Sequence, residues 1–230
     1  MSSLAEGFFE ALSLIITFDP DLMGIVFLSL RISLTAILLA TLAGVPLGTW
    51  LGLKPAAKTR FVTKVLYTLM GMPPVLVGLV FYLVFSRQGP LGVLGLLYTP
   101  IAMVIAQIVL ALPIVTGLTM VGIRSMGKDV SETARTLGAG DFLTALTVVR
   151  EARFTIMGAV VSGFGRITSE VAAVMIVGAN IQGYTRVMTT AIVLETNKGD
   201  FGFAMGLGLC LLALSFIVNS LLYRFQEGDN

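Results

Sequence analysis

The sequence predicts an all-α integral membrane protein with five transmembrane helices. Of its 230 residues, 56% are hydrophobic and only 12% are charged, a composition that a single soluble core of this size cannot bury. Several apolar stretches reach the length of about 20 residues that a helix needs to cross a bilayer. Short charged loops separate these stretches. We therefore expect one transmembrane domain, residues 1–230, surrounded by the lipid bilayer.

The composition also excludes several kinds of chemistry. The sequence contains no histidine, and its only cysteine, Cys210, lies inside an apolar stretch, which excludes disulfides and His/Cys metal sites. No nucleophile with a neighbouring base and no pair of carboxylates suggests a catalytic centre. We expect a chain that is not an enzyme, holds no cofactor or metal of its own, and has no nucleic-acid partner.

The first segment, residues 1–20, is predicted to be an amphipathic helix at the membrane interface. It lacks the basic start of a secretory signal and carries Glu6 and Glu10 instead, so a cleaved leader is not expected. The transmembrane spans then follow in order. They are expected at residues 23–53, 65–85, 99–123, 154–181 and 201–223.

Local residues support the individual spans. The first is longer than a hydrocarbon core of about 30 Å, so its Arg31 can approach the interface. In the third, Thr99 suits an N-cap and Pro100 the first helical position, and the helix continues through Pro113. Residues 186–200 contain too short an apolar run to cross, so they are expected to form a short helix or a re-entrant segment on the outer side.

Prolines and glycines predict how the spans bend and pack. Pro46, and the pair Pro73 and Pro74, are expected to bend their helices. Glycines at four-residue spacing permit close helix packing, which we expect to occur mainly within one subunit rather than between subunits. These glycines are Gly44, Gly48 and Gly52 on the first span and Gly202 and Gly206 on the last.

The basic residues predict the orientation, because Lys and Arg in short loops are retained on the cytoplasmic side. An N-terminus outside and a C-terminus in the cytoplasm place ten basic residues inside and three outside, while Arg31 and Arg166 lie within spans. The inner ten are Lys54, Lys58, Arg60, Lys64, Arg124, Lys128, Arg135, Arg150, Arg153 and Arg224, and the outer three are Arg87, Arg186 and Lys198. Residues 124–153 thus form a cytoplasmic loop.

This polar loop has the signals of a small rigid helical hairpin. Asp129 and Glu132 fit a capping box at the start of a helix of about two turns, and Gly138 offers a left-handed stop. Val130, Ala134 and Leu137 share one face at helical spacing, with Glu132 and Arg135 at the sides. Asp141 can then cap a second helix over residues 142–149. These signals alone leave an ordinary connecting loop equally open.

The stretch "ETARTLGAGDF", with Glu132, Ala134, Gly138 and Ala139, resembles the "EAA…G" loop of permease subunits in bacterial ATP-binding-cassette (ABC) importers. The resemblance implies the type I importer permease fold, with a coupling helix that docks on a separate ATPase. Two departures are visible: Thr133 stands at the second position of the motif, and Val149–Arg150 replaces a Leu-Pro pair. The implied coupling residues are Val130, Glu132, Ala134, Arg135, Leu137, Gly138 and Ala139.

A nearby match to the phosphate-loop spacing is a decoy. Gly122–Lys128 fits G-x-x-x-x-G-K, but Asp129 follows where a Ser or Thr should bind magnesium. The segment also follows a membrane helix rather than a strand. ATP and Mg²⁺ are therefore expected in a partner ATPase and not in this chain.

Charged and hydroxyl side chains within the fourth span suggest a translocation pathway. Arg166 and Glu170 are four residues apart and so are expected on one helix face, beside Thr168 and Ser169. Ionisable residues inside a span usually face the bundle interior or a water-filled cavity. Mutual neutralisation of the two charges is an equally open explanation.

The cargo is suggested by a second resemblance. Residues 168–201 are similar to the tungstate-importing branch of the molybdate/tungstate permeases, and the likeness extends over nearly all five spans. It implies a homodimer of this chain in the bacterial cytoplasmic membrane, two copies of an ABC ATPase, and an extracytoplasmic binding protein that delivers the oxyanion. The alternatives are the same fold serving molybdate, sulfate or an amino acid, and a secondary transporter that works without an ATPase.

Overall fold

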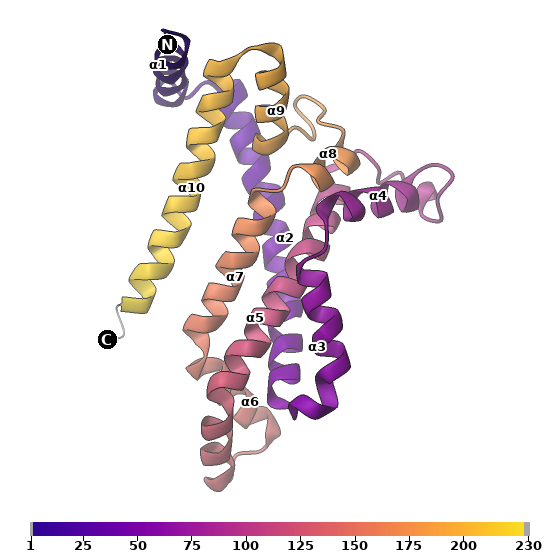
Figure 1. Ribbon diagram of the computed structural model, residues 1–230, viewed down its shortest axis with the longest axis vertical. Helices are drawn as coiled ribbons and strands as arrows, with labels where there is room; N and C mark the ends of the chain where they lie inside the picture. Colours follow the sequence, from indigo (N-terminus) through magenta and orange to yellow (C-terminus); the bar gives the residue numbers. More distant parts are fainter. Residues whose placement is uncertain (1, 228–230) are drawn as a thin grey trace. The chain divides into compact units, whose positions relative to one another are not determined.

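The computed structural model describes residues 2–227, and within this range the chain forms helices and no strands (Figure 1). The elements are α1 (Ser2–Ile16), α2 (Pro20–Leu53), α3 (Ala56–Met70), α4 (Pro74–Phe85), the 3₁₀ helix η1 (Gly92–Leu94), α5 (Pro100–Thr136), α6 (Asp141–Glu151), α7 (Arg153–Thr168), α8 (Ala172–Gly178), α9 (Met188–Lys198) and α10 (Phe201–Glu227).

Three helices of the described chain are long and apolar enough to cross a membrane, and two bent helix pairs could supply two more crossings. The long helices contribute Pro20–Leu53, Pro100–Gly127 and Phe201–Leu221, which overlap three of the predicted spans. The predicted spans 65–85 and 154–181 are not single helices. The first is divided between α3 and α4, which meet at 93°, and the second between α7 and α8, which meet at 58°. The number of crossings thus lies between three and five by length and composition.

The break between α3 and α4 has a clear sequence cause. Pro74 occupies the first turn of α4, and Pro73 before it has the extended backbone of an N-cap, with φ −63° and ψ 125°. Neither proline can donate a helical hydrogen bond, and each disfavours a helical conformation in the residue before it. The predicted bend at Pro73 and Pro74 is therefore present. In contrast, α2 continues through Pro46 and α5 through Pro113.

The chain divides into two compact units. The first comprises the chain up to Ala36 together with Pro73–Gln107 and Ile167–Ser220, and the second comprises Ile37–Met72, Ile108–Arg166 and the chain from Leu221 onward. The helices α2 and α5 each contribute to both units.

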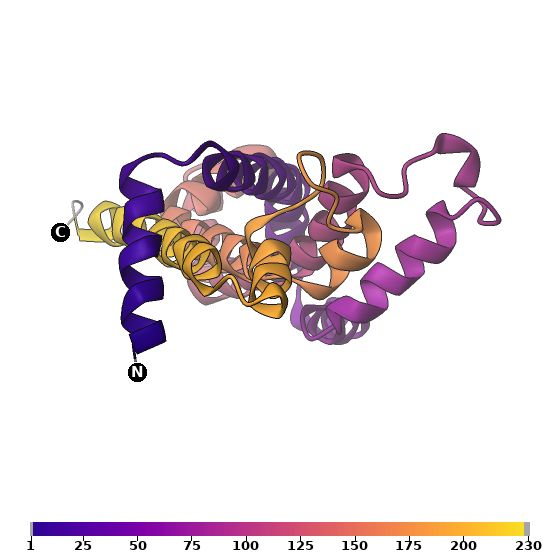
Figure 2. The same cartoon turned by 90° about the horizontal axis from the view of Figure 1, so that it is seen from above.

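In the first unit, α2, α9 and α10 share a core around Leu22, Met188 and Leu207. The Met188 N–H donates to Ser29 Oγ at 2.8 Å and so fastens the start of α9 to α2. Figure 2 shows α1 lying across the start of α10, where Glu10 contacts the position that a Cβ on Gly202 would occupy. The predicted use of Gly202 in packing within one subunit is confirmed.

In the second unit, the glycines of α2 let that helix approach α5 closely. A Cβ on Gly48 would lie 2.6 Å from the carbonyl oxygen of Thr116, and one on Gly52 would lie 2.7 Å from Cβ of Ile123. The guanidinium of Arg124 on α5 then donates to Thr59 Oγ1 of α3 at 2.6 Å, with longer contacts to Leu51 O and Thr63 Oγ1. Packing within one subunit is thus confirmed for this glycine row as well.

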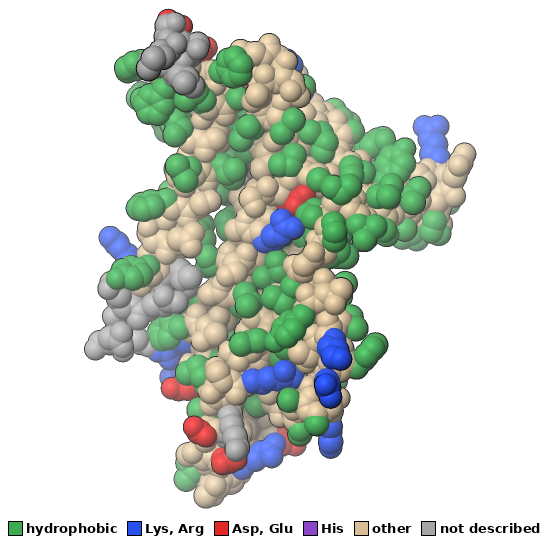
Figure 3. All heavy atoms as spheres, viewed as in Figure 1, with side chains coloured by type: hydrophobic (Ala, Val, Ile, Leu, Met, Phe, Trp, Pro, Cys, Tyr) green, Lys and Arg blue, Asp and Glu red, His purple; other side chains and the backbone are tan. Residues whose placement is uncertain are grey.

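Much of the apolar surface of the helices remains uncovered. Figure 3 shows hydrophobic side chains spread over the visible surface of the molecule. On α10, the exposed large hydrophobic side chains include Leu212, Phe216 and Ile217. A water-soluble monomer rarely exposes apolar patches of this extent. The surface fits a chain whose helices are surrounded by lipid or by partner helices.

Candidate functional site

The predicted cytoplasmic loop is a hairpin formed by the end of α5 and by α6. The structure corrects the predicted capping box, because α5 continues without interruption from Pro100 to Thr136. Asp129 and Glu132 therefore lie in the helix interior rather than at a helix start. Gly127 is the weakest helix former in this part of α5, and a single glycine costs about 1 kcal/mol relative to alanine, which the surrounding packing overrides.

The predicted stop at Gly138 is confirmed. Gly138 adopts φ +86°, which a glycine reaches without the steric cost of a Cβ. Its N–H donates to Arg135 O at 2.9 Å, and the Ala139 N–H donates to Ala134 O at 2.9 Å, so two helix-terminal carbonyls are satisfied. The next helix begins one residue earlier than predicted, because Gly140 is the N-cap and Asp141 is the first helical residue, without a side-chain cap.

The two arms of the hairpin pack together on their inner side. Val148 of α6 and Ala152, which follows α6, are fully buried against Ile123 of α5, and Val130 packs on the same cluster. This contact leaves the turn rigidly attached to the end of a long helix. At about 1.5 Å per residue, the 37 residues of α5 extend about 55 Å, which exceeds the hydrocarbon core of about 30 Å.

The hairpin carries an open groove with a mainly apolar lining. The groove has a volume of about 570 Å³. Five of the seven predicted coupling residues line it, namely Val130, Ala134, Leu137, Gly138 and Ala139. Nearby, Leu137 is 83% exposed and Phe142 is 84% exposed. Large apolar side chains so exposed at a polar turn are typical of a surface that another protein covers.

The two remaining coupling residues, Glu132 and Arg135, are exposed and do not line this groove. Arg135 forms an ion pair with Asp141 at 3.1 Å across the turn. Because both side chains are largely exposed, this ion pair contributes little to stability.

The predicted translocation residues occupy a helix end and not one helix face. The helix α7 ends at Thr168, so Arg166 lies in its last turn while Ser169 and Glu170 lie beyond it. The Glu170 carboxylate accepts the Ala173 N–H at 3.0 Å and thereby caps α8, and the Glu170 backbone carbonyl accepts the Thr189 hydroxyl at 2.8 Å. The prediction of a shared helix face is wrong, because the backbone leaves the helix between the two charges.

These residues differ in burial. Thr168 and Glu170 are buried and Ser169 is exposed, all in the first unit, whereas Arg166 is half-buried at the end of the second. The hydrogen bonds show that Glu170 stabilises the start of α8. A role of the four residues in translocation stays a prediction.

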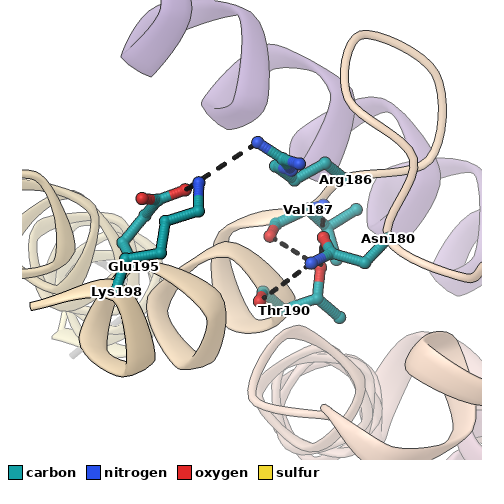
Figure 4. Close-up of polar contacts among 6 residues, drawn as sticks. All are labelled: Asn180, Arg186, Val187, Thr190, Glu195 and Lys198. Atoms are coloured by element: carbon teal, nitrogen blue, oxygen red, sulfur yellow. Dashed lines mark hydrogen bonds and ion pairs between the residues drawn. The ribbon is translucent and has the colours of Figure 1, made fainter. Parts of the chain in front are cut away.

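The first unit contains a charged pocket that the sequence does not predict. It has a volume of about 540 Å³, and Arg31, Arg186, Glu195 and Lys198 contribute to its lining. Figure 4 shows the last three of these residues. Glu195 Oε1 lies 2.9 Å from Lys198 Nζ and 3.8 Å from Arg186 Nη1. The side chains of Glu195 and Arg186 are only 9% and 13% exposed. Two cations therefore share one buried carboxylate.

A network of hydroxyl and amide groups fixes the loop that carries Arg186. The Thr190 hydroxyl donates to Asn180 Oδ1 at 2.8 Å and accepts the Val187 N–H at 3.2 Å (Figure 4). The hydroxyl of Thr185, which is fully buried, donates to Gly178 O and accepts the Ile181 N–H at 2.9 Å. These bonds hold the backbone on both sides of Arg186.

One contact in this pocket, between Glu195 and Lys198, is indicated by the spacing of the two residues in the sequence. Glu195 and Lys198 are three residues apart on a predicted short helix, a spacing that brings their side chains together. The approach of Arg186 has no such signal, because it depends on long-range contacts of the loop that precedes α9. From the sequence alone, Arg186 and Lys198 are therefore predicted only to be basic residues on the outer side.

Comparison with known proteins gives full-length relatives. Residues 44–228 match the family described as binding-protein-dependent transport system inner membrane component. The chain is 44% identical over 227 residues to the tungstate uptake system permease protein TupB of Peptoclostridium acidaminophilum, which covers 99% of this chain and 100% of that protein. It is 41% identical over 211 residues to a probable anion ABC transporter permease protein of Haloferax volcanii, covering 90% and 91% of the two chains. It is 38% identical over 222 residues to TupB of Campylobacter jejuni, covering 96% and 93%.

Proposed function

Because the chain belongs to the family of binding-protein-dependent transport system inner membrane components, we propose that it is the permease subunit of an ABC importer for tungstate. Two relatives named as tungstate uptake permeases match nearly the whole chain, at 44% and 38% identity. This full-length similarity carries the proposal. Family membership also favours an ABC importer over a secondary transporter that works without an ATPase.

The hairpin of α5 and α6 is the proposed docking site for the ATPase. Its groove presents apolar side chains with charged residues at the sides, the pattern of a protein–protein interface with an apolar core and a polar rim. The packing of Val148 against Ile123 ties the groove to the long helix α5. Movement of a docked ATPase would therefore act on a membrane helix rather than on a loose loop.

The proposed assembly contains two copies of this chain, two copies of a cytoplasmic ATPase and an extracytoplasmic binding protein. The chain contributes the path, and the ATPase binds ATP and Mg²⁺ and hydrolyses ATP. In the proposed orientation the N-terminus lies outside, so the hairpin faces the cytoplasm and the loop before α9 faces outward. Arg166, Thr168, Ser169 and Glu170 remain the proposed contacts along the path.

Uptake measurements test this proposal. A bacterial strain without its own tungstate and molybdate importers would express the chain with the ATPase and binding protein encoded beside it. Cellular tungsten, measured by mass spectrometry, is expected to rise only when all three components are present and the ATPase is active. Uptake that survives an inactive ATPase but stops with a protonophore would instead support a secondary transporter. Uptake of molybdate, sulfate or an amino acid without tungsten would correct the cargo.

A further inference from the structure

The guanidinium of Arg186 has a buried nitrogen without a hydrogen-bond partner. The Arg186 side chain is 13% exposed, and the ion contact of its Nη1 with Glu195, at 3.8 Å, is longer than a hydrogen bond. In the described part of the chain, the Nε of Arg186 is buried without an acceptor. Arginine carries five N–H donors and stays charged at every physiological pH. Buried groups of this kind are nearly always satisfied, so the pocket should hold an acceptor that the protein itself does not supply.

The charges around Arg186 favour a negatively charged acceptor. Lys198 and Arg186 both approach the same oxygen, Oε1, of Glu195, and Arg31 contributes a third cation to the lining. Two aspartates also line the pocket, but both lie at helix starts. Asp200 accepts the Phe203 N–H at 3.1 Å, and Asp21 lies in the first turn of α2. The positive end of a helix dipole offsets part of each aspartate charge.

The basic residues predicted outside the membrane provide an independent observation. Only Arg87, Arg186 and Lys198 are expected on that side, where the retention of Lys and Arg in the cytoplasm makes them uncommon. Two of these three converge on one pocket, together with Arg31. The hydrogen bonds around Thr190 and Asn180 hold the backbone that carries Arg186 before any ligand arrives, which lowers the cost of ordering this loop on binding.

We propose that this pocket is a transient binding site for the tetrahedral oxyanion cargo, with Glu195 occupying the place of the anion when the site is empty. The proposal rests on the proposed function, because it assigns a site to the cargo of that importer. Arginine presents a planar fork of donors that suits two oxygens of one oxyanion, and lysine adds a point charge. A volume of about 540 Å³ leaves room for such an ion and for water around it.

Equilibrium dialysis with tungstate tests the site directly. The purified complex of the permease and its ATPase is used without the binding protein, and bound tungsten is measured by mass spectrometry. Saturable binding is expected for the wild-type complex. Arg186→Ala should weaken it by about tenfold or more, the scale of a lost charge-assisted hydrogen bond. Glu195→Gln should instead tighten it by about threefold or more, because a competing negative charge is removed.

The opposite signs of these two effects separate a binding site from a structural ion pair. If Arg186 and Glu195 only stabilised the fold, both substitutions would lower the melting temperature and neither would change tungstate binding in folded protein. Arg87→Ala is the matched control, since it removes an exposed arginine predicted on the same side and outside this pocket. It should leave tungstate binding unchanged.

Two milder variants guard against misfolding. Arg186→Lys keeps the charge but loses the planar fork, so it should weaken binding less than Arg186→Ala. Thr190→Val removes the hydroxyl that holds Asn180 and Val187, so it should weaken binding through the loop alone. We therefore expect the affinity for tungstate to fall from the wild-type complex to Arg186→Lys and further to Arg186→Ala. The melting temperature of each complex shows whether the variant is folded.

Three outcomes would overturn the inference. They are no saturable binding by the wild-type complex, unchanged binding in folded Arg186→Ala, and weaker binding in Glu195→Gln. If Arg186→Ala abolished capture of the binding protein but not tungstate binding, the pocket would be a docking site for that protein instead. Tungsten uptake by the wild-type complex tests the proposed function separately, since it requires no variant of this pocket.

Discussion

Replacing Gly138 with alanine should destabilise the turn of the hairpin through backbone strain, without a steric clash. Its φ is +86°, and an added Cβ would meet no atom within 4 Å. The cost of Gly138→Ala is therefore conformational only, and a non-glycine residue in the left-handed region costs about 1–2 kcal/mol. One or two kcal/mol changes a folding equilibrium by a factor of about 5–30. The turn should open about that much more often than in the wild-type chain.

Gly140→Ala is the matched control for this prediction. Gly140 is two residues away and also has open space around an added Cβ, but its φ is −70°, which alanine adopts without strain. Alanine at this position reduces the conformational entropy of the unfolded chain, which stabilises the folded state by about 0.4–1 kcal/mol. Alanine is also a poorer N-cap than glycine, which destabilises the helix start. These two effects oppose each other, so the net change should be close to zero.

Hydrogen–deuterium exchange measures the opening. The Gly138 and Ala139 amides are protected by their bonds to Arg135 and Ala134, so they exchange when the turn opens. We expect the peptide that contains the turn to exchange about 5–30-fold faster in Gly138→Ala and at nearly the wild-type rate in Gly140→Ala. Equal exchange in the two variants would refute the role of the left-handed glycine.

A larger side chain at position 138 tests the role of the turn in transport. Gly138→Val places a β-branched residue where such a conformation is a true outlier. The chain should still reach the membrane, because the bundle core does not depend on the turn. Tungstate uptake should fall relative to ATP hydrolysis, which is measured on the same complex in vesicles. Unchanged uptake in Gly138→Val would count against the hairpin as the coupling element.

Two further predictions concern the second unit. Gly48→Ala should lower the melting temperature in detergent, because its Cβ would lie 2.6 Å from a carbonyl of α5, and overpacking typically costs about 1–3 kcal/mol. Gly158→Ala, whose Cβ meets nothing within 4 Å, should not lower that temperature and should raise it slightly, because alanine is the better helix former. Arg124→Ala should destabilise by about 1.5–3 kcal/mol through its lost bond to Thr59, measured in the same melting assay, and a wild-type melting temperature would show that this bond is dispensable.

Single residues in the sequence correctly predicted the helix ends at which the backbone lacks an N–H or adopts an unusual φ. Thr99 and Pro100 mark the start of α5, where Thr99 Oγ1 accepts the Ala102 N–H at 3.4 Å. Pro73 and Pro74 mark the bend, and Gly138 marks the turn of the hairpin. In each case one residue type has an unusual φ or lacks an N–H, so the sequence carries the information at the position itself.

Features that depend on tertiary contacts were not predictable in this way. The capping box at Asp129 was wrong, because packing of Val148 and Ala152 on Ile123 favours a continuous α5. The break after Thr168 involves no proline, so no residue type in the sequence marks it. The helical spacing therefore wrongly predicted that Arg166 and Glu170 lie on one helix face. The place of Arg186 depends on bonds between Asn180 and Thr190, ten residues apart, and on the contact of α9 with Ser29 of α2. No periodicity in the sequence encodes such contacts.

The carboxylate of Glu195 lowers the affinity of the proposed site for an anion. Such a group is expected in a site that must release its ligand. Without Glu195, the three cations of the pocket would hold a dianion more tightly, and tight holding slows transfer to the next site. A pathway requires binding that is favourable enough for entry and weak enough for exit. Glu195 meets both needs, because it neutralises part of the buried charge when the anion is absent and competes with the anion when it is present. The variant Glu195→Gln should therefore bind tungstate more tightly and yet transport it more slowly at saturating concentrations of the loaded binding protein.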